Sequence, residues 1–518
     1  MSLFTPRRIA ATFCRLPAVA LLVCCLSVFP PCTPRAAAAQ ESAATTDARG
    51  VVALPDTPAG KRCAAWLAAL NSGSRETLRR FLAESLAAPP DATPPVDAIT
   101  ARQFGLYANA RGFDLGKVVA SSPEKITVAL RAKRTGYWVL AGLGVTAEPP
   151  HRILGFGFRN TEAPADLLAR TRLNESQIRE RADALIDRLV AADQFSGVIL
   201  VARDGKPIYE RAAGLASRAW NVPNRADTKF NIASIGKMFT AVAVAQLVER
   251  GKLSYDDTLE KVLPDYANRE IAAKVTVRHL LAHTSGLTEA RSASAGDNSF
   301  RRGFRTIKEY LSGTANDTLK FEPGAKLEYS SYGYLVLGAV IERVSGQDYY
   351  EYIREHVYRP AGMRDSDCFE LDTDPPNLAT GYMDAAGGTR RSNTFRLPVK
   401  GLPYGLGYST AGDLVRFATA LHDRRLLRAD SLEAVWTGVM DYTEADSKYG
   451  YGFIVKRYNG VRIVGHGGGW VGITNKFDTY PDLGYTVVIL TNIDSDPNAV
   501  AFKLREWLTQ GGGPEKSR

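Results

Sequence analysis

The sequence predicts an α+β protein with a small folded segment, residues 58–163, ahead of a larger domain, residues 175–512. Three observations predict this architecture. A chain of 518 residues exceeds what a single hydrophobic core usually holds. The small segment shows helical spacing first and strand-like alternation afterwards. The larger domain has strand-like runs at both ends of a helical middle, an order typical of α+β folds.

The first 39 residues have the order of a secretory signal peptide. "MSLFTPRRIAATFCR" is basic, "LPAVALLVCCLSVF" is apolar, and "PRAAAAQE" supplies small residues for cleavage after Ala39. We therefore expect export to the periplasm or the extracellular space. No later apolar run reaches the roughly 20 residues of a membrane-spanning helix, so the mature chain is expected to lack one. Residues 40–57, rich in Ala, Thr and Asp, are predicted to be a linker.

The mature chain is expected to carry a mildly basic surface of mixed charge. The formal charge is +10, and removing the four arginines of residues 1–39 leaves +6. Acidic and basic residues are interspersed, so nucleic-acid binding is not predicted. Two cysteines, Cys63 and Cys368, remain after cleavage and make no disulfide framework. Whether they pair is left open, and so is the oligomeric state.

Residues 58–163 read as helices followed by strands. "KRCAAWLAAL" and "SRETLRRFLAESL" have helical spacing, and Ser74 is placed to cap the second helix. After a Pro-rich break, "KITVALRAK", "GYWVLAGLGV" and "HRILGFGFR" alternate like strands. The pattern is similar to cystatin-like or nuclear transport factor 2-like domains. Packing or substrate presentation is the expected role, and residues 164–193 are predicted to form a helical bridge.

The larger domain opens and closes with strands. "SGVILVARDGKPIYERAAG" predicts a hairpin around Asp204-Gly205, and "YGYGFIVKRY" leads into a second turn at Asn459-Gly460. Between them lies a helical middle, from Ser234 to about Tyr358, and a closing helix follows at about residues 498–508. Strands so far apart in the chain predict one antiparallel sheet, with the helices packed against it.

The stretch "NIASIGKMFT" places Ser234 and Lys237 three residues apart ahead of the apolar run "AVAVAQLVER". On a helix, positions i and i+3 lie on one face, about 5–6 Å apart at Cβ. A desolvated amine within reach of a hydroxyl can take its proton, and a helix N-terminus favours a developing oxyanion. The alternative is a simple N-cap serine beside a solvated lysine.

Three further stretches bear on that choice. "VTVRHLLAHTSGL" places His279 and His283 at i, i+4, a spacing that suits zinc but lacks the glutamate of a zinc-protease motif. "KLEYSSYGYL" places Tyr329 before an apolar helix, where a nearby ammonium would make its phenol a proton relay. "VGHGGGWVGI" sets three glycines after His466, which indicates close backbone approach at a strand.

In this order, Ser-x-x-Lys, Tyr-Ser-Ser and His-Gly-Gly resemble the three-element site of serine β-lactamases and penicillin-binding proteins. The stretches "VRHLLAHTSGL", "FEPGAKLEYSS" and "GLGYSTAGDLVRFATAL" resemble the class C-like branch, which includes esterases and D-amino-acid peptidases. The resemblance covers about residues 181–508. It implies a β-lactamase/transpeptidase-like domain, with an antiparallel sheet, packed helices and an all-helical part.

The resemblance also implies roles. Ser234 would be the acylated nucleophile, Lys237 its general base and Tyr329 the relay that activates the deacylating water. Backbone N–H groups of Ser234 and Gly469 would form the oxyanion hole. His466 would border the pocket, at the position where the family has a lysine that meets a substrate carboxylate.

Two departures bear on the substrate. Ser331 stands where the family has an asparagine amide, and His466-Gly467-Gly468 stands where it has Lys-Thr-Gly. A permanent cation thus becomes a histidine, which would change charge near its usual pKa of about 6.5 and make binding pH-sensitive. Both changes weaken the expectation of efficient β-lactam hydrolysis.

The sequence therefore predicts an exported serine hydrolase acting through an acyl-enzyme on an ester or a small amide or peptide bond, without metal or cofactor. One alternative is a non-catalytic, penicillin-binding-like sensor of cell-wall fragments, suggested by the missing asparagine. Another is a zinc protein that uses His279 and His283. The sequence leaves the substrate open.

Overall fold

The structure is a computed structural model, and it describes residues 52–88, 95–288, 303–312, 317–384, 389–442, 446–495 and 497–512. The predicted signal peptide and most of the predicted linker lie outside these ranges. Among the described residues, no helix is both long and apolar enough to cross a membrane.

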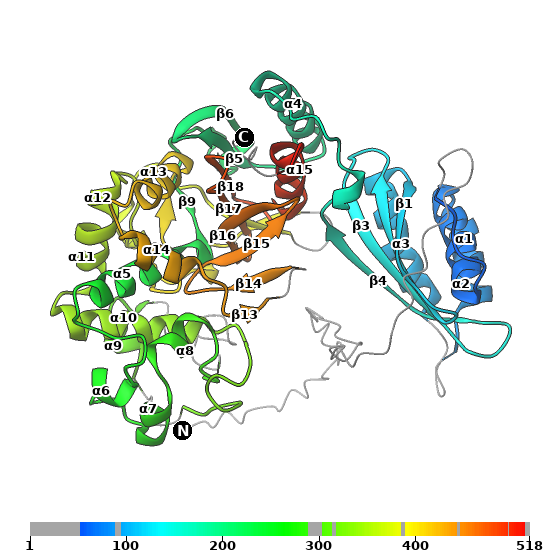
Figure 1. The fold of residues 1–518 in the computed structure, drawn as a ribbon. Helices are drawn as coiled ribbons and strands as arrows, with labels where there is room; N and C mark the ends of the chain where they lie inside the picture. The colour runs from blue at the N-terminus through cyan, green and yellow to red at the C-terminus, as the bar shows by residue number, and fades with distance from the viewer. Residues whose placement is uncertain are drawn as a thin grey trace, which may run out of the picture. The chain divides into compact units, whose positions relative to one another are not determined.

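The segment before residue 163 consists of helices followed by an antiparallel sheet (Figure 1). Ser74 caps the second helix by accepting a hydrogen bond from the Thr77 N–H, as predicted. The third helix and the first strand lack a strong sequence pattern and were not predicted. The elements are α1 (Pro58–Asn71), α2 (Arg75–Ser85), α3 (Val96–Ala110), β1 (Phe113–Ser121), β2 (Lys125–Ala132), β3 (Trp138–Val145) and β4 (Ile153–Thr161), with strand order β1-β2-β3-β4.

The bridge predicted at residues 164–193 is only partly helical. A short 3-10 turn covers Ala165–Leu167, and α4 runs from Glu175 to Ala191. The helix begins there because Asn174 and Gln177 form a reciprocal capping box. The prediction of one continuous helix is therefore wrong for the residues ahead of this cap.

An eight-stranded antiparallel sheet organises the larger domain, with order β13-β14-β15-β16-β17-β18-β5-β6. The two ends of this domain meet where β18 pairs with β5, Val488 opposite Leu200. The predicted hairpins at Asp204-Gly205 and Asn459-Gly460 are present, each with positive φ at both residues. The strands are β5 (Gly197–Arg203), β6 (Lys206–Ala213), β13 (Met440–Asp441), β14 (Ser447–Tyr449), β15 (Ile454–Tyr458), β16 (Val461–Trp470), β17 (Ile473–Tyr480) and β18 (Tyr485–Thr491).

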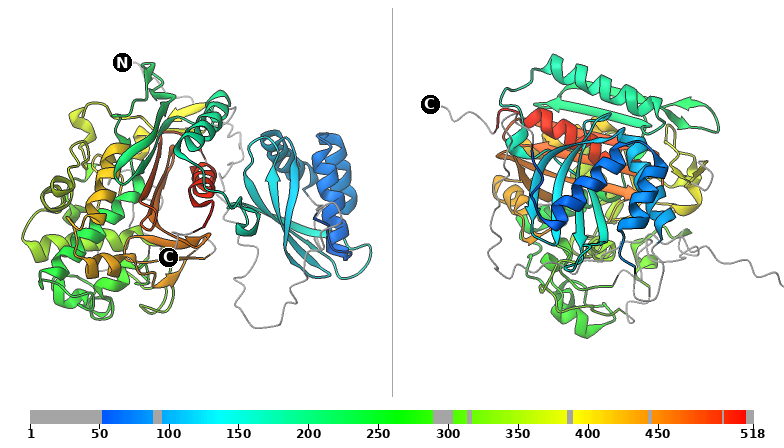
Figure 2. Two further views of the ribbon diagram at one scale, coloured as in Figure 1. Left: turned by 45° about the horizontal axis from the view of Figure 1, so that its top comes forward. Right: turned by 90° about the vertical axis from the view of Figure 1, so that its right-hand side faces the viewer.

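Alternation along the strands builds a core on each face of this sheet. In β5, Val198 and Leu200 face one core, whereas Ile199 and Val201 face the other. The first core is filled by α5, α10 and α13, and the second by α4 and α15, so helices cover both faces (Figures 1 and 2). These helices are α5 (Lys237–Glu249), α10 (Ser331–Ser345), α13 (Ala411–His422) and α15 (Pro497–Thr509).

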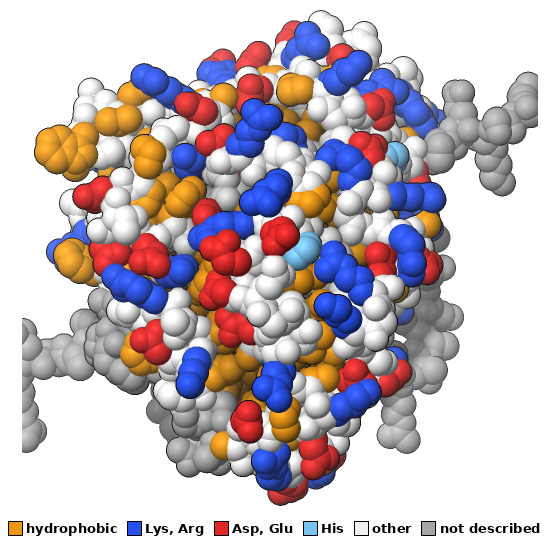
Figure 3. Space-filling model, turned by 90° about the vertical axis from the view of Figure 1, so that its left-hand side faces the viewer, with side chains coloured by type: hydrophobic (Ala, Val, Ile, Leu, Met, Phe, Trp, Pro, Cys, Tyr) orange, Lys and Arg blue, Asp and Glu red, His pale blue; other side chains and the backbone are white. Residues whose placement is uncertain are grey.

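Shorter elements complete the larger domain. Acidic and basic side chains are interspersed on the face that Figure 3 shows, in keeping with the mixed charge predicted from the sequence. The remaining helices are α6 (Leu259–Val262), α7 (Arg269–Lys274), α8 (Val277–Leu281), α9 (Ile307–Tyr310), α11 (Tyr349–Ile353), α12 (Arg359–Ala361) and α14 (Ala429–Trp436), and the remaining strands are β7 (Leu215–Ser217), β8 (Val222–Pro223), β9 (Phe230–Asn231), β10 (Tyr382–Asp384), β11 (Arg390–Ser392) and β12 (Tyr408–Ser409).

Candidate active site

Ser234 lies in a tight turn at the start of the central helix. A 3-10 turn, Ala233–Gly236, leads directly into α5, whose residues Lys237 to Leu247 are all buried. A helix that is apolar on nearly all sides is stable only inside a core, and this one is enclosed by the first core. The chain therefore holds the Ser234 hydroxyl on a rigid element at the edge of that core.

Two glycines let neighbouring backbone approach the Ser234 turn closely. At Gly468 in β16, an added Cβ would lie 2.2 Å from the Ile232 carbonyl oxygen, and at Gly405 it would lie 1.9 Å from the Ala233 carbonyl oxygen. Gly405 also has φ +131°, which favours glycine. The glycine run singled out in the sequence thus allows β16 to lie against the turn.

Lys237 is fully buried and its amine contacts the serine. Nζ lies 3.1 Å from Ser234 Oγ, 3.3 Å from Ser331 Oγ and 3.0 Å from the Tyr404 carbonyl oxygen. It also lies 4.7 Å from the centroid of the Tyr329 ring. A hydroxyl with a buried amine at hydrogen-bonding distance is the geometry of a nucleophile and its base.

A cavity of about 310 Å³ opens onto these groups. Four of the predicted site residues line it, and its described walls carry aromatic and apolar side chains but no charged one. Tyr404, Leu406 and Trp470 were not predicted as site residues, because only tertiary structure brings them to Ser234. The lining residues are Ala233, Ser234, Tyr329, Ser331, Tyr404, Leu406, Gly469 and Trp470.

His466 does not border this cavity, so its predicted place at the pocket wall is wrong. It is buried, with 3% of its surface exposed, and it is not among the lining residues. Its Nδ1 contacts the Gly467 carbonyl oxygen, and its Nε2 lies 3.0 Å from the Tyr449 hydroxyl. Because a carbonyl oxygen only accepts, Nδ1 carries the proton and the Tyr449 hydroxyl donates to Nε2.

The predicted charge change of His466 near neutral pH is also wrong. Burial, together with the charge of Lys237 when that amine is protonated, lowers the pKa of His466 to about 3. The imidazole is therefore neutral throughout the physiological range. A neutral ring, hydrogen-bonded to Tyr449, therefore stands where the resemblance implied a cation.

The two histidines of the zinc alternative hold backbone turns. His279 Nδ1 accepts a hydrogen bond from the Thr276 N–H at 3.2 Å, and His283 Nδ1 accepts one from the Ser330 N–H at 3.1 Å. Within the described ranges, no group of three or more His, Cys, Asp or Glu side chains is arranged to hold a metal ion. Of the described cysteines, Cys63 and Cys368 are both buried and unpaired.

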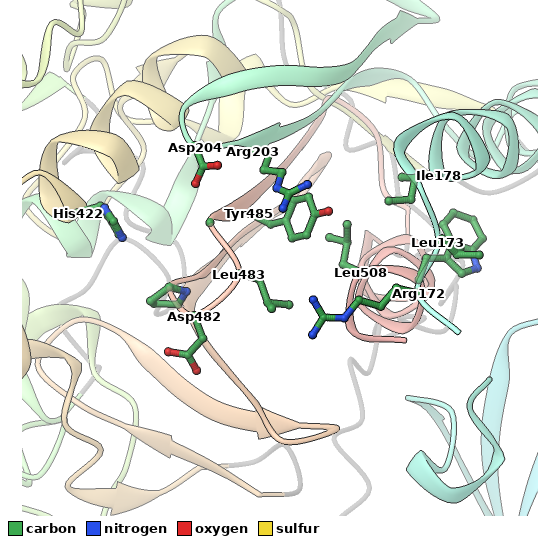
Figure 4. Close-up of a pocket in the computed structure, with 13 residues that line it drawn as sticks. Arg172, Leu173, Ile178, Arg203, Asp204, His422, Asp482, Leu483, Tyr485 and Leu508 are labelled. Carbon is green, nitrogen blue, oxygen red and sulfur yellow. The ribbon is translucent and has the colours of Figure 1, made fainter. Parts of the chain in front are cut away.

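Cavity size alone would not have identified this site. A larger cavity of about 510 Å³ is lined by residues of β5, β18 and α15, including Arg203, Tyr485 and Leu508 (Figure 4). None of the predicted catalytic residues lines it. The chemistry of the side chains, rather than the volume, identifies the smaller cavity.

Several known proteins are similar to this chain. A structure of a penicillin-binding protein from Bacillus halodurans is 31% identical, with a TM-score of 0.55, over 64% of this chain and 98% of that one. A D-amino acid amidase from Ochrobactrum anthropi is 25% identical, with a TM-score of 0.55, over 65% of this chain and 98% of its own. Esterase EstB of Burkholderia gladioli is 36% identical over 224 residues, which are 41% of this chain and 56% of the esterase.

A family model described as Beta-lactamase matches residues 182–509, which are most of the chain. The chain belongs to the beta-lactamase family of serine hydrolases.

Proposed function

We propose that this chain is an exported hydrolase that cleaves a carboxylic ester, or a small amide or peptide bond, through an acyl-enzyme on Ser234. The observation that carries the proposal is the 3.1 Å contact between Lys237 Nζ and Ser234 Oγ, in a cavity that Tyr329 also lines. An esterase and an amidase among the similar proteins support both bond types.

In the proposed reaction, Ser234 Oγ attacks the acyl carbon while its proton passes to the neutral amine of Lys237. The bond to the leaving alcohol or amine breaks, and the leaving group takes that proton. Water then attacks the acyl carbon, and its proton passes through Tyr329, the proposed relay, to Ser234 Oγ. The bond between Oγ and the acyl carbon breaks, and the acid is released. Backbone N–H groups of Ser234 and Gly469 would bind the oxyanion.

The pocket favours an uncharged acyl group. Its described lining residues include Tyr329, Tyr404 and Trp470 but no lysine or arginine, and His466 is neutral and buried. A substrate whose carboxylate needs a positive partner would find none among these side chains. We therefore place short-chain and aromatic esters ahead of D-alanyl peptides and penicillins.

The test compares the wild type with Ser234→Ala. The purified wild type should hydrolyse p-nitrophenyl butyrate with many turnovers and become labelled by an acylating probe, whereas the variant should do neither while keeping its circular dichroism spectrum. Labelling that persists in the variant would refute the role of Ser234.

A second candidate function is a non-catalytic sensor, which Ser331 supports by replacing the family's asparagine amide. That function predicts stoichiometric release of p-nitrophenol, one equivalent per protein, followed by no turnover. Export is tested separately: N-terminal sequencing of the protein recovered outside the cytoplasm should begin at Gln40.

A further inference from the structure

His283, which the proposed mechanism does not use, is buried directly beside the proposed relay. It follows α8, is 1% exposed and has a left-handed backbone with φ +57°. Its ring centroid lies 4.2 Å from that of Tyr329, 4.5 Å from that of Tyr449 and 5.2 Å from that of Tyr334. The imidazole thus fills the space behind the Tyr329 ring.

His283 also holds the backbone on both sides of Tyr329. Its carbonyl oxygen accepts the Glu328 N–H at 2.9 Å, and its Nδ1 accepts the Ser330 N–H at 3.1 Å. Ser330 in turn caps α10 by accepting the Gly333 N–H. Hydrogen bonds to one histidine therefore hold the residues on either side of Tyr329 before the chain enters the helix.

Only a neutral imidazole can accept the hydrogen bond from the Ser330 N–H. Nδ1 must keep its lone pair to accept the Ser330 N–H, so the ring proton lies on Nε2. Burial, followed by the positive charges of Lys237 and His466 when protonated, lowers the pKa of His283 well below its usual value. A protonated ring would lose the hydrogen bond from the Ser330 N–H.

We infer that His283 is a positioning residue that holds the Tyr329 phenol beside Lys237 and Ser234. The inference rests on the proposed function, since it assumes that Tyr329 acts in the reaction. It assigns to the histidine of the "HTSGL" stretch a role in catalysis through Tyr329, in place of the zinc ligation that its spacing first suggested.

Two substitutions separate the hydrogen bond from the ring. His283→Phe keeps an aromatic ring beside Tyr329 but leaves the Ser330 N–H without its acceptor. His283→Asn loses the ring, keeps an acceptor oxygen and tolerates the left-handed backbone. We expect kcat to fall by about 10- to 100-fold in the phenylalanine variant, since displacements near 1 Å cost that much. The asparagine variant should recover most of this loss.

A double-mutant cycle distinguishes positioning from general destabilisation. Values of kcat for p-nitrophenyl butyrate are measured per acylatable site in the wild type, in each single variant of His283→Phe and Tyr329→Phe, and in the double variant. If His283 acts through Tyr329, its substitution should change kcat less than about twofold once Tyr329 is phenylalanine. If His283→Phe lowers kcat by the same factor whether residue 329 is tyrosine or phenylalanine, the inference is overturned.

A matched control uses another stacked histidine. His356 lies 4.3 Å from the Tyr352 ring, in the helical part and away from the cavity lining. His356→Phe should leave kcat per site unchanged, and a loss equal to that of His283→Phe would also count against the inference. Activity that survives in Ser234→Ala would instead refute the proposed function, so the two failures are distinguishable.

Discussion

The neutral state of His466 makes a prediction that can be measured directly. With a pKa of about 3, about 1% of this imidazole is protonated at pH 5, against about 97% for a histidine with the usual pKa of 6.5. All six histidines of the sequence lie within the described ranges. Between pH 8 and pH 5, the NMR chemical shifts of the His466 and His283 rings should not change, because burial lowers both pKa values.

The lowered pKa of His466 also makes the unfolding free energy depend on pH. Because the folded-state pKa lies below the unfolded-state value, the unfolded chain binds the extra proton as the pH falls. The stability from a neutral His466 is fully present above about pH 6.5 and is lost progressively toward pH 3. Between pH 7.5 and pH 5 the loss is about 2 kcal/mol of unfolding free energy.

The assay is heteronuclear NMR of protein labelled at histidine Cε1, with the His466 signal assigned by its absence in His466→Gln. Chemical denaturation of the wild type and of His466→Gln at pH 5 and pH 7.5 measures how much the unfolding free energy changes with pH. This change should be about 2 kcal/mol smaller in the variant. A His466 signal with a midpoint between pH 6 and pH 7 would refute the reasoning.

Two further predictions concern packing at and behind the site. Gly468→Ala should lower kcat by up to about 100-fold, since its Cβ would force the Ile232 carbonyl, and with it the Ser234 turn, to move. At Gly467 an added Cβ would meet nothing closer than 3.7 Å, so Gly467→Ala should lose far less unfolding free energy in chemical denaturation than Gly468→Ala. An equal loss in the two variants would contradict the steric argument. Arg505→Met should cost about 3–5 kcal/mol of unfolding free energy, because it leaves the buried Asp478 carboxylate without the guanidinium that bonds it at 2.7 Å. A loss under about 1 kcal/mol would contradict this prediction, because an ion pair at the surface contributes only that much.

Much of the architecture could be predicted because local patterns decided it. Asp204-Gly205 and Asn459-Gly460 favour tight hairpins wherever they occur, and the alternation in β5 already assigns its two faces. The third helix of the N-terminal segment could not be predicted, since "VDAITARQFGLYANA" lacks a strong amphipathic period. The helical bridge was predicted too long because Asn174 caps a helix that propensity alone would extend.

The sequence by itself brought the two proposed reacting groups together, since Ser234 and Lys237 lie three residues apart where a 3-10 turn leads into a helix with a long buried run. The tertiary structure alone decided what surrounds them. His466 became a neutral partner of Tyr449, and His283 came to lie against Tyr329. The physical reason is that charge state and side-chain position depend on burial and on contacts between distant segments, which residue spacing does not encode.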